Sequence, residues 1–92
     1  MSNVRITVEA TFRDAIEKLP PDRQRSAISA VMKFQTEPTL PSLRFRPLQG
    51  APGYFIISAN RGDRVILRRD AENLYAAVDV GPHDNVYNRW NR

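Results

Sequence analysis

Residues 53–80 decide the fold, and they read GYFIISANRGDRVILRRDAENLYAAVDV. Three segments in this stretch, GYFIISA (53–59), DRVILRR (63–69) and NLYAAVDV (73–80), are rich in the β-branched and aromatic residues typical of strands. The connections NRG and DAE are short enough for hairpins, which predicts three neighbouring antiparallel strands. Gly81 and Pro82 then end the third strand.

The residues before this stretch predict one strand and two helices. NVRITVEA (3–10) alternates apolar with polar residues, which is the period of a half-buried strand. An apolar stripe at helical spacing follows and stops at Pro20; it contains Phe12, Ala15, Ile16 and Leu19. Pro21 suits the start of a second helix, whose stripe crosses DRQRSAISAVMKFQ (22–35). We therefore expect an αα-hairpin around the Pro-Pro turn.

The remaining segments flank the sheet. LRFRPLQG (43–50) is either a short strand or an extended loop, and Pro47 confines such a strand to a sheet edge. HDNVYNRWNR (83–92) predicts a short terminal helix, with Asp84 capping its start and Arg89 or Arg92 near its negative end. Residues 1–92 are thus expected to form one α+β domain, in which a largely antiparallel sheet carries the two N-terminal helices on one face and has a short C-terminal helix.

The composition limits the chemistry. With no cysteine there is no disulfide framework or thiolate nucleophile, and a single histidine, His83, rules out a histidine-rich metal site. We therefore expect no metal, no cofactor, no membrane segment and a cytoplasmic location. The net charge of +4 comes mostly from arginines, which hold their charge and grip phosphate in two-point contacts. This balance favours a polyanion or an acidic protein as partner, although a basic surface alone needs none.

Strand alternation predicts how the arginines are presented. Arg64 and Arg68 share one face of their strand, and Val65 and Leu67 share the other. We expect Val65 and Leu67 to pack on the two helices, so the two arginines project to the uncovered face. If the terminal segment folds over that face, three more side chains come near them: His83, Asp84 and Tyr87.

Arginine, histidine and tyrosine together suit metal-independent cleavage of RNA. An imidazole can transfer a proton at neutral pH, guanidinium groups can stabilise the negative charge that develops on phosphate, and a phenol can stack on a base. Asp84 can orient the imidazole of His83. Each residue also has a simpler interpretation: His83 as an exposed turn residue, Asp84 as a helix cap, Tyr87 with Trp90 as an anchor of the helix on the sheet, and Arg68 as one half of a surface ion pair.

The motifs FRDAIEKLP (12–20), LRFRPLQGAPGYFIIS (43–58), DRVILR (63–68) and VGPHDNVYNRW (80–90) together resemble the RelE/ParE superfamily of toxins from toxin–antitoxin systems. The branch with G-x-H-D-x-x-Y endings is the most similar. This resemblance covers essentially the whole chain. It implies a curved antiparallel sheet, an mRNA interferase that cuts mRNA in the ribosomal A site by 2′-hydroxyl attack, and neutralisation by an acidic antitoxin.

The resemblance also implies roles for single residues. Arg64 matches a phosphate-stabilising arginine, His83 lies near a second functional position that is a catalytic histidine in some members, and Tyr87 matches a tyrosine that positions the substrate. We further expect three residues to contribute to substrate and phosphate binding: Arg61, Arg68 and Asp84. The sequence departs from the family at Phe55 and Ile57, where typical RNA-cleaving members carry lysines.

Two other functions remain open from the sequence. One is a non-catalytic binding module of the same fold, either a gyrase-directed toxin of the ParE type or a degenerate accessory domain. The other is a small DNA- or RNA-binding domain that uses its arginines only for phosphate contacts.

Overall fold

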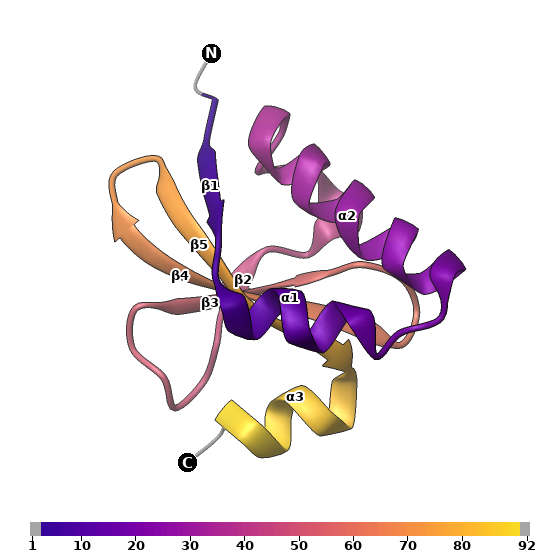
Figure 1. Ribbon diagram of the computed structural model, residues 1–92. Coiled ribbons are helices and arrows are strands. Elements are labelled where there is room, and N and C mark those ends of the chain that lie inside the picture. Colours follow the sequence, from indigo (N-terminus) through magenta and orange to yellow (C-terminus); the bar gives the residue numbers. More distant parts are fainter. Residues whose placement is uncertain (1–2, 91–92) are drawn as a thin grey trace.

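The structure, a computed structural model, describes residues 3–90 (Figure 1). In chain order, the elements are β1 (Arg5–Val8), α1 (Ala10–Glu17), α2 (Pro21–Thr36), the short 3-10 helix η1 (Pro41–Leu43), β2 (Arg46–Pro47), β3 (Tyr54–Ser58), β4 (Asp63–Ala71), β5 (Leu74–Pro82) and α3 (His83–Trp90). This order confirms the expected α+β architecture. Arg92 lies outside the described residues, so its expected position near the negative end of the terminal helix stays a prediction.

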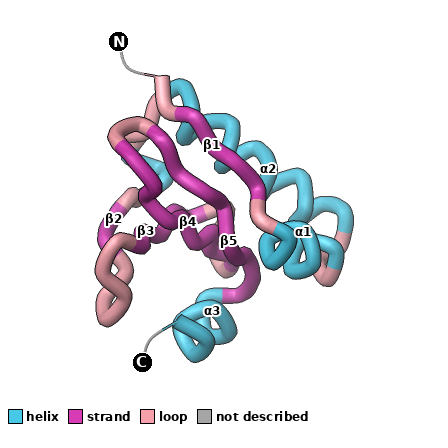
Figure 2. The backbone as a smooth tube through the Cα atoms, turned by 60° about the vertical axis from the view of Figure 1, so that its left-hand side comes forward, coloured by secondary structure: helices cyan, strands magenta, loops and turns pink. Residues whose placement is uncertain are grey.

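The five strands form one curved sheet in the order β1-β5-β4-β3-β2 (Figure 2). All neighbours are antiparallel except β1 and β5, which run parallel. The predicted hairpins are confirmed, and the β4–β5 turn places Asn73 at φ 61°, a left-handed conformation that asparagine tolerates. Pro47 lies in the two-residue edge strand β2, as the sequence predicts, because a proline has no N–H to donate to a second neighbour.

The first core lies between the sheet and the two N-terminal helices. Val65 and Leu67 of β4 face these helices, which confirms the predicted orientation of the strand. Phe34 of α2 is fully buried and meets the ring of Tyr75 edge-on, with 5.2 Å between centroids. Two further aromatic rings extend this cluster: Phe45 and Phe55. Pro21 opens α2, where its missing N–H costs nothing.

The second core lies on the opposite face of the sheet and is covered by α3 (Figure 2). Val86 of α3 is fully buried against Ile56 of β3, Ile66 of β4 and Val78 of β5. The terminal segment therefore folds over the face that the two N-terminal helices leave open, as the sequence analysis anticipates. No helix among residues 3–90 combines the length and the apolar character needed to cross a membrane.

A β-bulge in β5 shapes this second face. Ile66 pairs with Asp79 whereas the next residue, Leu67, pairs with Ala77, so Val78 is an extra residue in its strand. Val78 joins the second core, and the carboxylate of the adjacent Asp79 bonds to side chains of α3. The bulge thus lets two consecutive residues of β5 contact the same helix.

Candidate active site

An open groove of about 840 Å³ lies between α3 and the segment that begins with β2. The second core forms the apolar floor of the groove, and polar residues of α3 and of the β2 segment form its walls. The lining residues are Arg46, Pro47, Leu48, Gln49, His83, Asp84, Tyr87 and Asn88. The groove therefore brings the predicted His83–Asp84–Tyr87 set next to an arginine from a distant part of the chain.

His83 and Tyr87 lie one helical turn apart on α3, so their rings share one face of the helix. The ring centroids are 4.2 Å apart and the planes meet edge-on at 82°. The Nδ1 atom of His83 lies 3.1 Å from Oδ1 of Asp84, while 47% of the histidine side chain remains exposed. The imidazole is therefore oriented on one side and accessible on the other.

Asp84 lies inside the first turn of α3 rather than before it, because the helix begins at His83. The predicted role as a cap that precedes the helix is therefore wrong. A carboxylate in the first turn still favours the helix through the positive end of its dipole. The backbone N–H of His83 is satisfied elsewhere, by donating to the carbonyl oxygen of Gly62 at 2.7 Å.

Two arginines approach the phenol of Tyr87. Arg46 donates from Nη2 to the Tyr87 hydroxyl at 3.4 Å and from Nη1 to the carbonyl of Arg44. Arg64 lies near this phenol, close enough for the charges of Arg46 and Arg44 to act on it. Burial lowers the pKa of Arg64, and the charges of Arg46 and Arg44 lower it further. This corner of the molecule is thus strongly positive.

The protein holds the guanidinium group of Arg64 through its Nη1 atom. The side chain is 8% exposed, and its Nη1 atom donates to the carbonyl oxygens of Asn60 at 2.9 Å, Asp63 at 2.9 Å and Arg61 at 3.3 Å. The Nε atom is buried and has no hydrogen-bond partner among residues 3–90. A buried cation with an unused donor is suited to an anionic ligand, because phosphate or carboxylate oxygens would both satisfy the donor and balance the charge.

The structure separates two other predicted residues from this cluster. Arg68 forms an ion pair with Asp70, with Nε 2.7 Å from Oδ1, and a longer contact of 3.5 Å with Glu9. These partners raise the pKa of Arg68, chiefly through the hydrogen bond to Asp70. Arg61 is exposed in the turn before β4, and its backbone carbonyl, as noted, accepts from Arg64. The simpler interpretation of Arg68 as an ion-pair residue thus fits its contacts.

Sequence reasoning missed Arg44 and Arg46 as site residues. They flank Phe45 in the segment LRFRP (43–47), and Arg46 meets Tyr87 across a sequence separation of 41 residues. The available signal was the alternation of arginines around an aromatic residue that packs on the first core, which turns both arginines away from that core.

Phe55 and Ile57 belong to the face of β3 that contacts the first core, so neither points to the groove side of the sheet. Tyr54 and Ile56 belong to the second core on the groove side, where strand alternation also places Ser58. The chain has two lysines, Lys18 and Lys33, and neither lies in β3. The lysines of the family have no equivalent on either face of this strand.

The C-terminal end of α3 is fixed to the sheet by Asp79. Asp79 is 6% exposed, and its carboxylate accepts hydrogen bonds from Nε of Arg89 at 2.7 Å, Nη2 of Arg89 at 3.1 Å and Nε1 of Trp90 at 2.8 Å. Trp90 also packs on Tyr54, with 5.0 Å between ring centroids. The expected anchoring of the helix by Trp90 is confirmed, and the contact of Tyr87 with Arg46 shows that Tyr87 also faces the groove.

No family model matches the sequence, and no curated protein matches it. Solved structures do resemble its fold. The toxin–antitoxin complex RelBE2 from Mycobacterium tuberculosis is similar with a TM-score of 0.62 and 23% identity, over 90% of this chain and 94% of that chain. YafQ from Escherichia coli strain BL21(DE3) has a TM-score of 0.67 and 13% identity, over 91% and 98%. A doubly substituted Escherichia coli toxin RelE in the free state has a TM-score of 0.68 and 14% identity, over 99% and 95%.

The agreement extends over nearly the full length of both chains in each pair. At these identities it establishes the fold, which is the fold of RelE and YafQ toxins. The architecture that the sequence resemblance implies is therefore confirmed.

Proposed function

We propose that this chain is a toxin-like endoribonuclease that cleaves mRNA by attack of a ribose 2′-hydroxyl on the neighbouring phosphorus. The observation that carries the proposal is the gathering of His83, Tyr87 and Arg46 at one groove, with Arg64 buried beside them. The fold supports it as well, because the sequence resembles the RNA-cleaving branch of a superfamily whose toxins share this architecture.

His83 acts as the general base in this proposal. Its Nδ1 atom faces Asp84, which leaves Nε2 to accept the proton of the 2′-hydroxyl. As the bond from O2′ to phosphorus forms, the bond from phosphorus to O5′ breaks, and the leaving oxygen takes up a proton from water. The products are a 2′,3′-cyclic phosphate and a free 5′-hydroxyl, and the reaction needs no metal ion.

The arginines stabilise the charge that develops on the phosphate. Arg64 offers the buried, unpartnered Nε–H, and Arg46 offers a second guanidinium group next to the Tyr87 hydroxyl. Fixed donors in a site of low polarity favour the transition state because they need no reorganisation as charge appears. Tyr87 orients the substrate through its hydroxyl group or by stacking on a base.

The partners follow from charge and from the proteins of the same fold. The substrate is mRNA on the ribosome, with the A site as the place of cleavage, and the net charge of +4 favours both the RNA and an acidic antitoxin. A RelE–RelB complex from Pyrococcus horikoshii OT3 and the toxin–antitoxin complex RelBE2 contain a chain of this fold. We propose that an antitoxin covers the groove of this chain.

A non-catalytic RNA- or protein-binding module is the second candidate. The observation that favours it is the composition of β3 on the groove side, where Tyr54, Ile56 and Ser58 supply no lysine, histidine or carboxylate. His83 would then be the single proton carrier, and a groove without effective proton transfer would hold RNA or gyrase without cleaving a bond.

Cleavage of a labelled mRNA, with and without translating ribosomes, separates the two candidates. We expect the parent chain to cut, and His83→Ala and Arg64→Lys to reduce the rate by about 100-fold or more, since each removes a proton carrier or a transition-state donor. Tyr87→Phe should have a smaller effect. Arg5→Lys makes the same change at an exposed arginine of β1, at the other edge of the sheet, and serves as the matched control for Arg64→Lys.

Three outcomes decide the matter. Full cleavage by His83→Ala would contradict the assignment of the base. RNA binding without any cut product from the parent chain would favour the binding module. Inhibition of gyrase with intact translation would identify the ParE type.

A further inference from the structure

The turn of residues 59–62, between β3 and β4, is closed by a side chain. Oδ1 of Asn60 accepts hydrogen bonds from the backbone N–H groups of Gly62 at 2.9 Å and Asp63 at 2.8 Å. Nδ2 of Asn60 donates to Oδ2 of Asp63 at 2.9 Å. One amide side chain therefore fixes both the backbone of the turn and the carboxylate that follows it.

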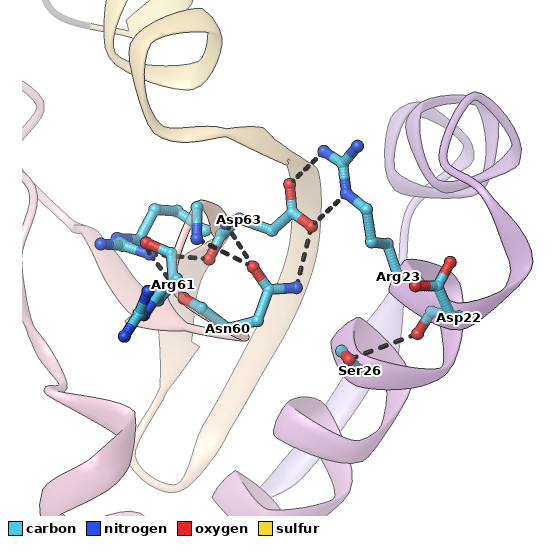
Figure 3. A network of polar contacts seen from close by, with 8 residues as sticks. Asp22, Arg23, Ser26, Asn60, Arg61 and Asp63 are labelled. Atoms are coloured by element: carbon cyan, nitrogen blue, oxygen red, sulfur yellow. Dashed lines mark hydrogen bonds and ion pairs between the residues drawn. The ribbon is translucent and has the colours of Figure 1, made fainter.

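The Asp63 carboxylate ties this turn to α2. It is 1% exposed and accepts two hydrogen bonds from Arg23, one from Nε at 2.8 Å and one from Nη2 at 2.7 Å. Figure 3 shows Asn60 and Asp63 facing Arg23 across the gap between the sheet and the helix. Only the Asp63 side of this pair is buried, since 39% of the Arg23 side chain is exposed. Such a pair is weak evidence of stabilisation, because the cost of removing the carboxylate from water offsets the attraction. The way in which the Arg23–Asp63 pair orients neighbouring groups is a better guide to its role.

The backbone carbonyls of the turn point to two parts of the proposed active site. Three carbonyls, of Asn60, Arg61 and Asp63, accept from Nη1 of Arg64. The Gly62 carbonyl accepts from the backbone N–H of His83, which is the first residue of α3. One short turn therefore holds the proposed phosphate-binding arginine and the start of the helix that carries the proposed base.

We propose that Asn60 and Asp63 are positioning residues, which hold the backbone carbonyls of the 59–62 turn in place. These carbonyls occupy Nη1 of Arg64 and leave its Nε free for the substrate, and they fix His83 at the groove. Neither residue touches the substrate. The catalytic part of this inference rests on the proposed function, whereas the geometric part does not.

Removal of the Asn60 side chain tests the geometric part without RNA. In Asn60→Ala, we expect the ¹H–¹⁵N signals of the His83 backbone amide and the Arg64 Nε–H group to shift. The His83 amide bonds to one carbonyl of this turn and the Arg64 guanidinium group bonds to others, and these carbonyls lose their orientation in the variant. The matched control is Gln24→Ala. Gln24 lies in the first turn of α2, next to Arg23, and its side-chain amide donates to the backbone carbonyl of Leu19, but it does not bond to the 59–62 turn.

Kinetics on RNA test the catalytic part. Asn60→Ala should lower kcat by about tenfold or more with KM within about twofold, since misplaced groups lose transition-state stabilisation more than binding. Gln24→Ala should keep the parent kcat. Asn60→Ser retains an oxygen acceptor that closes such turns more weakly, so it should restore part of the rate, and it replaces Asn60→Ala if the alanine variant does not fold.

Each result bears on one part of the inference. Unchanged His83 and Arg64 signals in the folded Asn60 variants, or equal shifts in Gln24→Ala, would overturn the positioning role. Shifted signals with an unchanged kcat would overturn its link to catalysis. A parent chain that does not cleave RNA would refute the proposed function, and the spectra would still decide whether the turn positions the two groups.

Discussion

The two faces of the sheet are covered in different ways. The face toward α1 and α2 is packed with large apolar and aromatic side chains around Phe34. The face toward α3 is covered by one eight-residue helix, held by Val86 and by the carboxylate of Asp79. Among the described residues, the buried charged ones are Asp63, Arg64 and Asp79. Arg64 bonds to the turn that also holds the first residue of α3, and Asp79 bonds to α3 itself. Stability is thus concentrated on the first face, and the groups suited to chemistry lie on the second.

Truncation of Phe34 should give the largest effect on stability and test the first face. Phe34→Ala removes a fully buried ring from the aromatic cluster, so we expect the free energy of unfolding to fall by about 3–5 kcal/mol. Urea titration followed by circular dichroism measures this loss. Met32→Ala, at a side chain that is 61% exposed on the same helix, should change stability by about 0.5 kcal/mol or less. Similar losses in both variants would contradict the packing described here.

Loss of the Asp79 charge should release α3 while the first face stays folded. Asp79→Asn is isosteric, but it removes the negative charge and turns one acceptor oxygen into an NH2 group, which cannot accept from Arg89 or Trp90. We expect a loss of about 1.5–3 kcal/mol that is local to the helix. Hydrogen exchange should become faster in the amides of α3 and remain slow in β4. The control is Asp14→Asn, at an exposed position of α1. Uniform acceleration through the whole sheet would mean that the two faces do not unfold separately.

Acid should weaken the link between the 59–62 turn and α2. The hydrogen bond from Arg23 holds the pKa of Asp63 below its usual range, whereas an aspartate in the unfolded chain titrates at about 3.9. Below about pH 5 the unfolded state therefore binds more protons, so this contribution is complete above that pH and is lost as the pH falls toward the lower folded pKa. Urea titrations at neutral and acidic pH should show a smaller pH dependence for Asp63→Asn than for the parent chain. Equal pH dependence would refute this contribution.

The smallest effect is expected at Arg68. Its guanidinium group is paired with Asp70 and Glu9, so Arg68→Ala should leave both mRNA cleavage and the melting temperature close to those of the parent chain. A loss of cleavage similar to that of Arg64→Lys would show that Arg68 exchanges its acidic partners for phosphate, as the sequence analysis predicts.

Local patterns predicted much of this architecture. Period-2 alternation placed Val65 and Leu67 toward the helices, and the prolines marked the start of α2 and the edge strand. The histidine and the tyrosine four residues later were predicted to share a site because both follow the same strand end. These features depend on residues that are close in sequence.

The missed features depend on residues that are distant in sequence. Arg46 reaches Tyr87 across 41 residues, and Arg23 reaches Asp63 across 40. The bulge at Val78 changes the register of β5 without any glycine or proline to mark it. Strand pairing and helix packing decide such contacts, so the alternation of arginines around Phe45 could turn Arg44 and Arg46 away from the first core but could not place Arg46 beside Tyr87.

The two outer strands of the sheet have a consequence for chains at high concentration. An unpaired strand edge can recruit an identical chain and so begin aggregation. Here β2 contributes two residues, one of which is Pro47, and β1 contributes four. Neither side offers a long ladder of free backbone groups, so the chain should resist growth into stacked sheets even when it is produced in large amounts.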